Sequence, residues 1–388
     1  MNVKIPMHLL GDLKNYKFVS LILDKNFQTI FRHDFVKNEE SSFDFFNKKI
    51  DYVTVPDEEF QECDSIIFFP FSEKTNNWSS KIMMRKNEEF FKMNGGFEFI
   101  KNANSTPDIN KIKNWINNGK NIKKINDLTG SKNLIYFTVF GSDEYIELLK
   151  ILLNSIEKQS FKDFELLFIT DNVTLHKIKK ILNVNSFKVN YFIVESIEDP
   201  VQASMQKLKI YQWEKIDRYK SILFLDVDIV VIGDLKNIFS DKINNNIFYS
   251  AIHDPRQLLH KTVYHCLIDY TPDELKNFET KGILAFNAGQ FIFNNTRTMK
   301  EHFANINSFV ESWNGRYFFE QSFLNYYFNI LEISDTKTLK SHFQFVSINE
   351  NQTNNKFEND AVTVHFMGNA CNGVGKLDFM KKFYKNYL

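Results

Sequence analysis

The chain has 388 residues, and its 48 basic and 48 acidic side chains leave a formal net charge of zero. A balanced charge excludes recruitment of nucleic acid by a bulk field, so any phosphate group must bind at a local site. Cys63, Cys266 and Cys371 are few, odd in number and far apart, which argues against a disulfide framework and for a reducing compartment.

The beginning of the sequence lacks the pattern of a signal peptide, and no apolar run reaches the ~18 residues that span a membrane. We therefore expect an intracellular, cytoplasmic protein with no transmembrane segment, compatible with peripheral contact with a membrane. The sequence is rich in Asn, Lys and Ile, with 41 Phe and only 7 Pro. This bias is typical of an AT-rich genome, such as that of a bacterium, a protist or a large virus.

The first part of the chain carries strand patterns. Apolar runs predict strands at residues 18–23, 29–36, 49–55 and 66–69, the first two joined by a polar hairpin turn. No catalytic pattern lies among them. We expect residues 1–95 to form a smaller, β-rich accessory domain, in which pairing of exposed strands would give a homodimer.

Residues 96–132 are dense in Asn, Gly and Lys and have weak apolar periodicity. This composition predicts a linker, interrupted by a short helix near Ile112 to Ile116.

From residue 133 onwards strands alternate with helices. Apolar runs predict strands at residues 134–140, 164–170, 189–194 and 221–231, separated by segments whose apolar residues recur at helical spacing. This alternation predicts an α/β fold with a mainly parallel sheet and right-handed crossovers. In such sheets ligands bind at the carboxyl ends of the strands, where Asp143, Asp171 and the pair Asp226 and Asp228 all fall.

Asp226 and Asp228 interrupt an apolar run that otherwise reads as a strand buried on both faces. An unpaired buried carboxylate is costly, so the pair is tolerable where the strand breaks and its oxygens face a cation. Two hard oxygen donors this close suit Mg²⁺ or Mn²⁺, which could hold substrate phosphates.

Two other interpretations of the acid pair stay open at this point. Two acids at a strand end can cap a turn and hold no ligand, since motifs this short recur by chance. The nucleophile motif of phosphohydrolases also places Asp-x-Asp after an apolar strand. That motif normally opens its fold, whereas several strand and helix patterns precede Asp226 here.

The rest of the chain continues the pattern. Further elements are predicted as a strand at 247–252, a polar insertion beside the site at 253–281, a strand at 283–293, helices at 296–313 and 318–331, a strand at 362–366 and a basic amphipathic helix at the end. Asn287-Ala288-Gly289 interrupts the second of these strands, and a glycine inside a strand marks a bulge or a close backbone approach.

Five segments share their content and order with one family. They are Gly141 to Tyr145, Gln206 to Ile210 with Tyr219 to Asp228, Phe286 to Gly289, Glu320 to Asn325, and Val364 to Gly368. In this order they resemble the nucleotide-sugar glycosyltransferases of the GT-A fold, family 8, the group of glycogenin and the lipopolysaccharide galactosyltransferases. The resemblance covers residues 133–388 and implies a GT-A (Rossmann-like) domain with helices on both faces of the sheet.

The resemblance also implies an activity: metal-dependent, retaining transfer of a hexose from a UDP-sugar to a hydroxyl group of a glycan, a lipid-linked sugar or a protein. Asp226, Asp228 and His365 would bind Mn²⁺ or Mg²⁺, although a lone strand histidine is more often structural. The implied donor-binding residues are Asp143 and Tyr145 at the uracil, Asp171, Asp226 at the ribose, Asn287, Ala288 and Gly289 at the sugar, and Gly368 and Lys376 at the diphosphate.

The implied catalytic residues are Gln321, below the anomeric carbon, with Glu320 beside it, and Lys207 facing the donor. Here the chain departs from the family pattern. Lys207 replaces an Arg and loses its bidentate fork, and Glu320 replaces an Asp that is one methylene shorter. Lys376 lies farther from Gly368 than the family lysine does and lacks the following Pro-Trp, and residues 1–132 have no counterpart.

Other classes of protein share parts of this pattern. A sugar-phosphate nucleotidyltransferase needs a glycine-rich, basic loop after its first strand, whereas the turn here is acidic with the single glycine Gly141. A non-catalytic sugar-binding or assembly protein, derived from a decayed transferase, is the other alternative. The presence of Asp226, Asp228 and His365 speaks against it.

Overall fold

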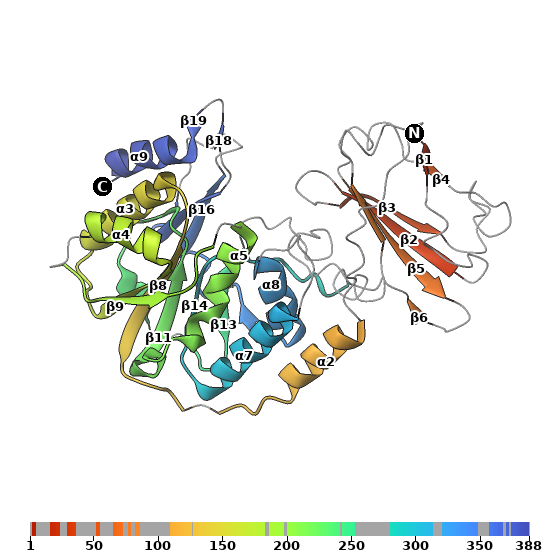
Figure 1. Cartoon of the computed structure of the whole chain (residues 1–388), viewed down its shortest axis with the longest axis horizontal. Helices are drawn as coiled ribbons and strands as arrows, with labels where there is room; N and C mark the ends of the chain where they lie inside the picture. Colours follow the sequence, from red (N-terminus) through yellow and green to blue (C-terminus); the bar gives the residue numbers. More distant parts are fainter. Residues whose placement is uncertain are drawn as a thin grey trace. The chain divides into compact units, whose positions relative to one another are not determined.

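A computed structural model gives the architecture of the chain (Figure 1). It describes the backbone of seven strands before residue 86, and then residues 109–125, 127–182, 186–197, 200–240, 243–252, 280–312, 320–347, 357–367, 370–371 and 374–387. Gly368 and residues 253–279 of the expected insertion lie outside these ranges. The chain divides into two compact units, of which the larger comprises residues 115–255, 286–310 and 319–388.

The larger unit is built on a central sheet that is mainly parallel, as the alternation of elements predicted. Its strand order is β10 (Val189–Ile193), β9 (Phe164–Thr170), β8 (Lys132–Val139), β11 (Tyr219–Leu225), β14 (Asn287–Asn294), β13 (Phe248–Ala251) and β15 (Ser334–Asp335). β14 runs antiparallel to both of its neighbours, and every other pair is parallel. The carboxyl ends of β8, β9, β10 and β11 therefore share one edge.

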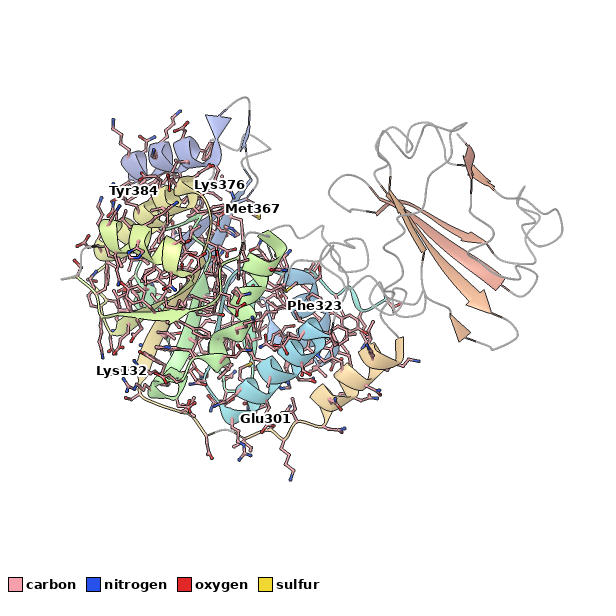
Figure 2. All side chains as sticks on the ribbon, in the orientation of Figure 1. Lys132, Glu301, Phe323, Met367, Lys376 and Tyr384 are labelled. Carbon is pink, nitrogen blue, oxygen red and sulfur yellow. The ribbon has the colours of Figure 1, made fainter. Side chains whose placement is uncertain are left out.

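Helices cover both faces of this sheet (Figure 1). They are α3 (Asp143–Glu157), α4 (Asn172–Ile181), α5 (Pro200–Met205), α7 (Arg297–Glu311), α8 (Glu320–Ile330) and α9 (Lys376–Tyr387). Because side chains alternate along a strand, Ile135 and Phe137 of β8 join the apolar cluster of Leu149 in α3. Tyr136, between them, faces the other side and donates a hydrogen bond to the carbonyl oxygen of Lys207 at 3.1 Å. Figure 2 draws the side chains that fill these layers.

A second, smaller sheet begins shortly after β11, the strand of the central sheet that ends at Leu225. Its strands are β12 (Ile229–Val231), β17 (Thr363–Met367) and β16 (Phe343–Ser347), with β12 antiparallel to β17. The chain thus leaves one sheet at Leu225 and enters another at Ile229, and the acid pair lies in the gap. The expected break of the strand at the two aspartates is confirmed.

Part of the segment expected to be a linker is a regular helix, α2 (Ile109–Lys120), longer than the short helix expected near Ile112 to Ile116. Trp115 explains the difference, because its indole is buried and stacks on Phe309 with ring centroids 4.0 Å apart. The carbonyl oxygen of Trp115 also accepts a hydrogen bond from Asn305 at 2.9 Å. Aromatic packing thus joins Trp115 of α2 to α7 within the larger unit.

The first part of the chain contains antiparallel strands. They are β1 (Asn2–Lys4), β2 (Tyr16–Leu23), β3 (Thr29–Phe35), β4 (Tyr52–Thr54), β5 (Ser65–Ser72), β6 (Asn77–Trp78) and β7 (Ile82–Arg85). β2 pairs with β3 as the expected hairpin and also with β5. Among the described helices of the whole chain, none has the length and apolar character needed to cross a membrane.

Candidate active site

The two sheets bring distant segments together at the acid pair. The backbone N–H of Asp226 donates to the carbonyl oxygen of Gly289 at 2.7 Å, which extends the pairing of β11 with β14. On the other side, Ile229 is in register with His365, and the N–H of Phe366 donates to the carbonyl oxygen of Asp228 at 3.0 Å. Backbone pairing therefore fixes His365 beside the aspartates although 137 positions separate it from Asp228 in the sequence.

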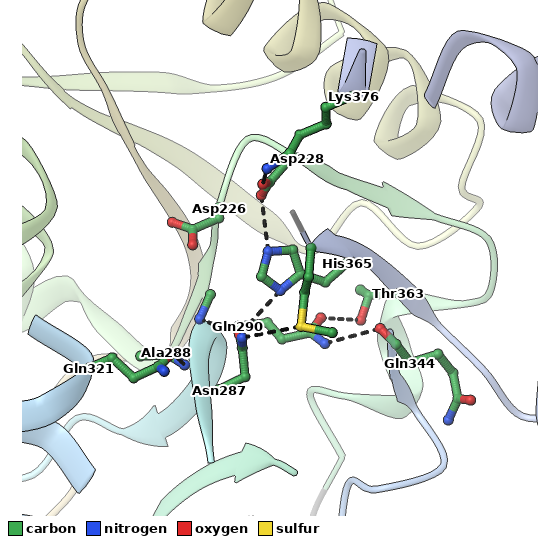
Figure 3. A network of polar contacts seen from close by, with 12 residues as sticks. Asp226, Asp228, Asn287, Ala288, Gln290, Gln321, Gln344, Thr363, His365 and Lys376 are labelled. Atoms are coloured by element: carbon green, nitrogen blue, oxygen red, sulfur yellow. Dashed lines mark hydrogen bonds and ion pairs between the residues drawn. The ribbon is translucent and has the colours of Figure 1, made fainter. Parts of the chain in front are cut away.

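Asp226, Asp228 and His365 each offer one ligand atom, and these atoms lie within 4.8 Å of one another (Figure 3). His365 Nε2 is 3.1 Å from Asp228 Oδ1. The side chain of Asp226 is 32% exposed, whereas those of Asp228 and His365 are 15% and 7% exposed. Two carboxylates and an imidazole, open on one side, form a ligand set suited to a divalent cation such as Mn²⁺.

Gly289 lies so close to this cluster that a side chain at this position would force its neighbours to move. A Cβ atom at this position would be 2.2 Å from His365 Cε1 and 2.8 Å from Asp226 Oδ2. This is the close backbone approach that a glycine inside a strand predicts. The amide of Asn287, two residues earlier, contacts both the N–H of Gly289, at 2.7 Å, and His365 Nδ1, at 3.1 Å.

Lys207 is buried beneath the acid pair, in η4 (Gln206–Gln212), a short helix that precedes β11. Its Nζ lies 2.7 Å from Glu320 Oε1 and 3.2 Å from Asp226 Oδ1, and it donates to the carbonyl oxygen of Ala288 at 3.3 Å. Burial alone would lower the pKa of Lys207, but the two carboxylates raise it above its ordinary value. Lys207 is therefore a fixed positive charge under the site.

Lys376, at the start of α9, contacts the opposite side of the pair. Its Nζ is 2.5 Å from Asp228 Oδ2. Burial favours the neutral form of Asp228, but Lys376 and His365 together outweigh it and hold the pKa of Asp228 well below its usual range. Burial, together with the charge of Asp228, raises the pKa of Asp226 instead. The pKa values of the two carboxylates of one motif are thus shifted in opposite directions.

Glu320 and Gln321 open α8 and face the same site. Gln321 Oε1 accepts a hydrogen bond from the N–H of Ala288 at 2.8 Å, which ties α8 to β14. Glu320 Oε2 is buried and has no hydrogen-bond partner among the described residues. Asn325, one turn along α8, bonds to both the N–H and the carbonyl oxygen of Phe286, each at 2.8 Å. These contacts set the distance between the start of α8 and β14.

The residues expected at the nucleotide lie at the ends of β8 and β9. Tyr145 lies in the first turn of α3, and its side chain is 51% exposed. Asp143 pairs with Lys177 at 2.6 Å, and Asp171 caps α4 by accepting the N–H of Thr174 at 2.7 Å. Asp143 and Asp171 therefore have structural partners of their own, and their donor-binding roles stay predictions.

Sequence reasoning missed a second layer of polar residues behind the site. Thr363 Oγ1 donates to Gln290 Oε1 at 2.6 Å, and Gln290 Nε2 donates to the carbonyl oxygen of Gln344 at 3.4 Å (Figure 3). Gln290 follows the Asn-Ala-Gly motif in an otherwise apolar strand. The signal in the sequence was a glutamine next to the apolar run of a strand predicted to be buried. The structure buries Gln290 fully, and a buried polar group needs a hydrogen-bond partner.

Fold and site together define a glycosyltransferase of the GT-A class, and a comparison with protein families agrees. The family described as "Glycosyl transferase family 8" matches residues 137–370, more than half of the chain. The chain belongs to glycosyl transferase family 8. The fold and enzyme class expected from the sequence motifs are thereby confirmed.

Solved structures similar to this chain are also glycosyltransferases. The bifunctional glycosyltransferase WbbM, in its apo form, has a TM-score of 0.47 and 17% identity over 68% of this chain, and the match spans about half (51%) of WbbM. The galactosyltransferase LgtC, in complex with donor and acceptor sugar analogues, has a TM-score of 0.46 and 15% identity, covering 66% of this chain and 96% of LgtC. Mouse xyloside xylosyltransferase 1, in its apo form, has a TM-score of 0.43 and 12% identity, and the match covers 60% of this chain and 97% of the xylosyltransferase. No curated protein matches the chain.

Proposed function

We propose that this protein is a metal-dependent, retaining glycosyltransferase that moves a hexose or related sugar from a UDP-sugar to a hydroxyl group of a glycan, a lipid-linked sugar or a protein. The observation that carries the proposal is the meeting of Asp226, Asp228 and His365 within 4.8 Å of one another at the carboxyl end of β11. The family comparison supports the transferase class. The metal, the donor and the stereochemistry are the proposed part.

The ligand set fits a divalent cation. Asp228 Oδ1 is buried and accepts no hydrogen bond from any described residue, although His365 Nε2 lies 3.1 Å away. A buried carboxylate oxygen without a donor is costly unless a cation occupies the space beside it. Mn²⁺ or Mg²⁺ bound by Asp226, Asp228 and His365 would supply positive charge to the departing diphosphate.

The residues around this position have roles that follow from their charge. Lys376 would neutralise the diphosphate, and the backbone of Gly368 would approach it. Lys207 holds Asp226 and Glu320 in place from below. The buried, unpartnered Oε2 of Glu320 is suited to accept a hydroxyl hydrogen of the donor sugar.

The remaining donor contacts are proposed from position. Tyr145 exposes an aromatic face at the edge of the sheet and would stack on the uracil, with Asp143 and Asp171 nearby. The segment from Asn287 through Ala288 to Gly289 would line the sugar pocket, with Gln321 below the anomeric carbon. Retention is proposed from the resemblance to the family alone, since both stereochemical outcomes occur on this fold.

A donor-hydrolysis assay tests the proposal. Protein is incubated with Mn²⁺ and a panel of UDP-sugars, and released UDP is measured; the wild type should release UDP slowly from one of them. Asp228→Asn should lose this activity by at least about 100-fold, because a neutral amide binds a divalent cation far more weakly. The anomeric configuration of the released sugar, followed by NMR, reports retention.

Asp234→Asn is the matched control, because Asp234 caps the next short helix through the N–H of Lys236 and contributes nothing to the cluster. This variant should keep wild-type activity. Equal UDP release by wild type and Asp228→Asn would contradict the metal assignment.

Assembly and location are proposed from the sequence. We infer a cytoplasmic protein whose partners are the nucleotide-sugar and the hydroxyl acceptor, with no nucleic-acid partner and with a homodimer formed through the strands of the first 95 residues. Light scattering on the purified full chain measures its mass directly. A monomeric mass at micromolar concentration would contradict the dimer.

A further inference from the structure

Asn287 is the first residue of β14, and its side chain is almost fully buried beside the proposed metal site. Its Oδ1 accepts the backbone N–H of Gly289 at 2.7 Å and lies 3.1 Å from His365 Nδ1. A backbone N–H can only donate, so the amide atom that faces Gly289 must be the oxygen. The orientation of the Asn287 amide is therefore fixed by the backbone, and the usual ambiguity between its oxygen and nitrogen does not arise.

This orientation determines which nitrogen of His365 carries a proton. An amide oxygen only accepts hydrogen bonds, so the His365 nitrogen that contacts it, Nδ1, must be the donor. A neutral imidazole has one N–H, and Nε2 is therefore left with its lone pair. In the neutral ring that lone pair lies beside Asp228 Oδ1, at 3.1 Å, on the side of the cluster where a metal would bind.

We propose that Asn287 is a positioning residue that sets the tautomer of His365, and so prepares Nε2 as a metal ligand before any metal arrives. The inference rests on the metal site of the proposed function. A ligating histidine commonly donates its second N–H to a carboxylate or carbonyl oxygen, which fixes the ring and raises its basicity. Here a side-chain amide supplies that oxygen.

The role differs from the one expected for Asn287 at the sugar pocket. Both lone pairs of its oxygen are used, one by Gly289 and one by His365. Its Nδ2 lies 3.7 Å from the sulfur of Met367, a weak acceptor. The oxygen of Asn287 is thus committed to the metal ligand and cannot accept a sugar hydroxyl.

The same short segment explains the other two positions of the motif. The N–H of Ala288 is held by Gln321 at 2.8 Å, and Gly289 leaves room for the imidazole that Asn287 orients. The residues of the Asn-Ala-Gly segment therefore act together on His365: the amide of Asn287 sets its tautomer, and the absence of a side chain at Gly289 leaves space for its ring.

The test is a nitrogen NMR measurement on the metal-free full chain, labelled with nitrogen-15 in its histidines, with His365→Asn used to assign the signal. In the wild type we expect the Nδ1–H tautomer of His365. In Asn287→Ala this tautomer should give way to Nε2–H, and the Mn²⁺ affinity, measured by electron paramagnetic resonance without nucleotide, should fall by about 10- to 100-fold. Asn287→Asp keeps an acceptor oxygen and should keep both the tautomer and at least the wild-type affinity.

Thr363→Val is the matched control, because Thr363 lies two residues before His365 and bonds to Gln290 rather than to the imidazole. It should leave the tautomer unchanged.

An Nε2–H tautomer in the wild type, or an Asn287→Ala protein with unchanged tautomer and affinity, would overturn the proposal. If Asn287→Ala does not fold, the wild-type and Asn287→Asp spectra decide. A wild type that shows Nδ1–H yet binds no Mn²⁺ supports the role of Asn287 and counts against the proposed metal dependence alone.

Discussion

Lys376 and a divalent cation need the same carboxylate. Lys376 Nζ contacts Asp228 Oδ2, while the other oxygen, Oδ1, faces His365 and has no hydrogen-bond donor among the described residues. A metal bound through Oδ1 would share the charge of this carboxylate with the ammonium and repel it, and the ammonium would then be available to the proposed diphosphate. The lysine would therefore weaken metal binding in the absence of nucleotide and strengthen nucleotide binding once metal is present.

Lys376→Met should reveal this competition. We expect Mn²⁺ affinity without nucleotide to rise roughly 3- to 10-fold, since losing an ion pair of about 1 kcal/mol changes an equilibrium by about that factor. UDP affinity in the presence of Mn²⁺ should fall. Titrations of Mn²⁺ with and without UDP measure both effects, and Lys381→Met, an exposed position on the same helix, is the control. A variant with weaker Mn²⁺ binding than the wild type would contradict the competition.

At the residue scale, the sequence predicted which side chains meet but not what each one contacts. The acid pair was recognisable because carboxylates inside an apolar run need a partner. The contacts of Asn287 and Lys376 were not, because each depends on distances between segments far apart in the chain. The asparagine expected at the sugar pocket, for example, contacts a histidine 78 positions away.

Three segments meet at Gly289: its own strand β14, the residue after β11, whose N–H donates to Gly289, and β17, which carries His365. Gly289→Ala would place a methyl group 2.2 Å from His365 Cε1, so β17 or β14 would have to move. We expect a loss of about 1–3 kcal/mol of stability, as for other overpacked positions, and a loss of Mn²⁺ binding of at least about 10-fold.

Thermal denaturation and Mn²⁺ titration of the same preparation check this prediction. Gly375→Ala is the control, because a Cβ there meets nothing within 4 Å. If Gly289→Ala bound Mn²⁺ as the wild type does, the close approach would have no functional consequence.

At the element scale, periodicity predicted most of the larger unit. The predicted helices at 296–313 and 318–331 correspond to α7 and α8, within one or two residues at each end. The second sheet could not be predicted, because β12 and β16 are short and their pairing with β17 is a long-range contact. Helix α2 was underestimated for a similar reason, since its stability depends on where Trp115 packs.

At the scale of the whole molecule, the carboxyl ends and the amino ends of the strands in the central sheet carry different groups of polar residues. The carboxyl edge holds the candidate active site. The amino edge holds a buried carboxylate, Glu165, which accepts hydrogen bonds from Lys132 at 2.7 Å, Lys188 at 2.8 Å and Tyr219 at 2.6 Å. Because these partners come from β8, from just before β10 and from β11, one carboxylate joins three neighbouring segments of the sheet.

This carboxylate predicts how the protein responds to acid. Burial would raise the pKa of Glu165, but the hydrogen bonds from Lys132, Lys188 and Tyr219 outweigh it and lower the pKa from 4.5 to about 2. A carboxylate with a lowered pKa stabilises the folded state fully above its unfolded value, and the contribution disappears as the pH falls from about 4.5 to about 2. A full shift of about 2.5 units corresponds to about 3 kcal/mol; we expect about 2 kcal/mol, because the two lysines are half exposed and screened.

Glu165→Gln should therefore destabilise the protein at pH 7 and have a smaller effect at pH 3. Chemical denaturation at both pH values, followed by tryptophan fluorescence, measures the difference, with Trp213 stacked 5.7 Å from Tyr219 as a nearby reporter. Glu301→Gln is the control, since Glu301 pairs with Arg297 on an exposed helix face, and such pairs contribute little. The same loss of stability at pH 3 as at pH 7 would show that Glu165 acts through its shape and not through its charge. A loss confined to the higher pH would place acid sensitivity at the amino edge of the sheet, away from the candidate active site.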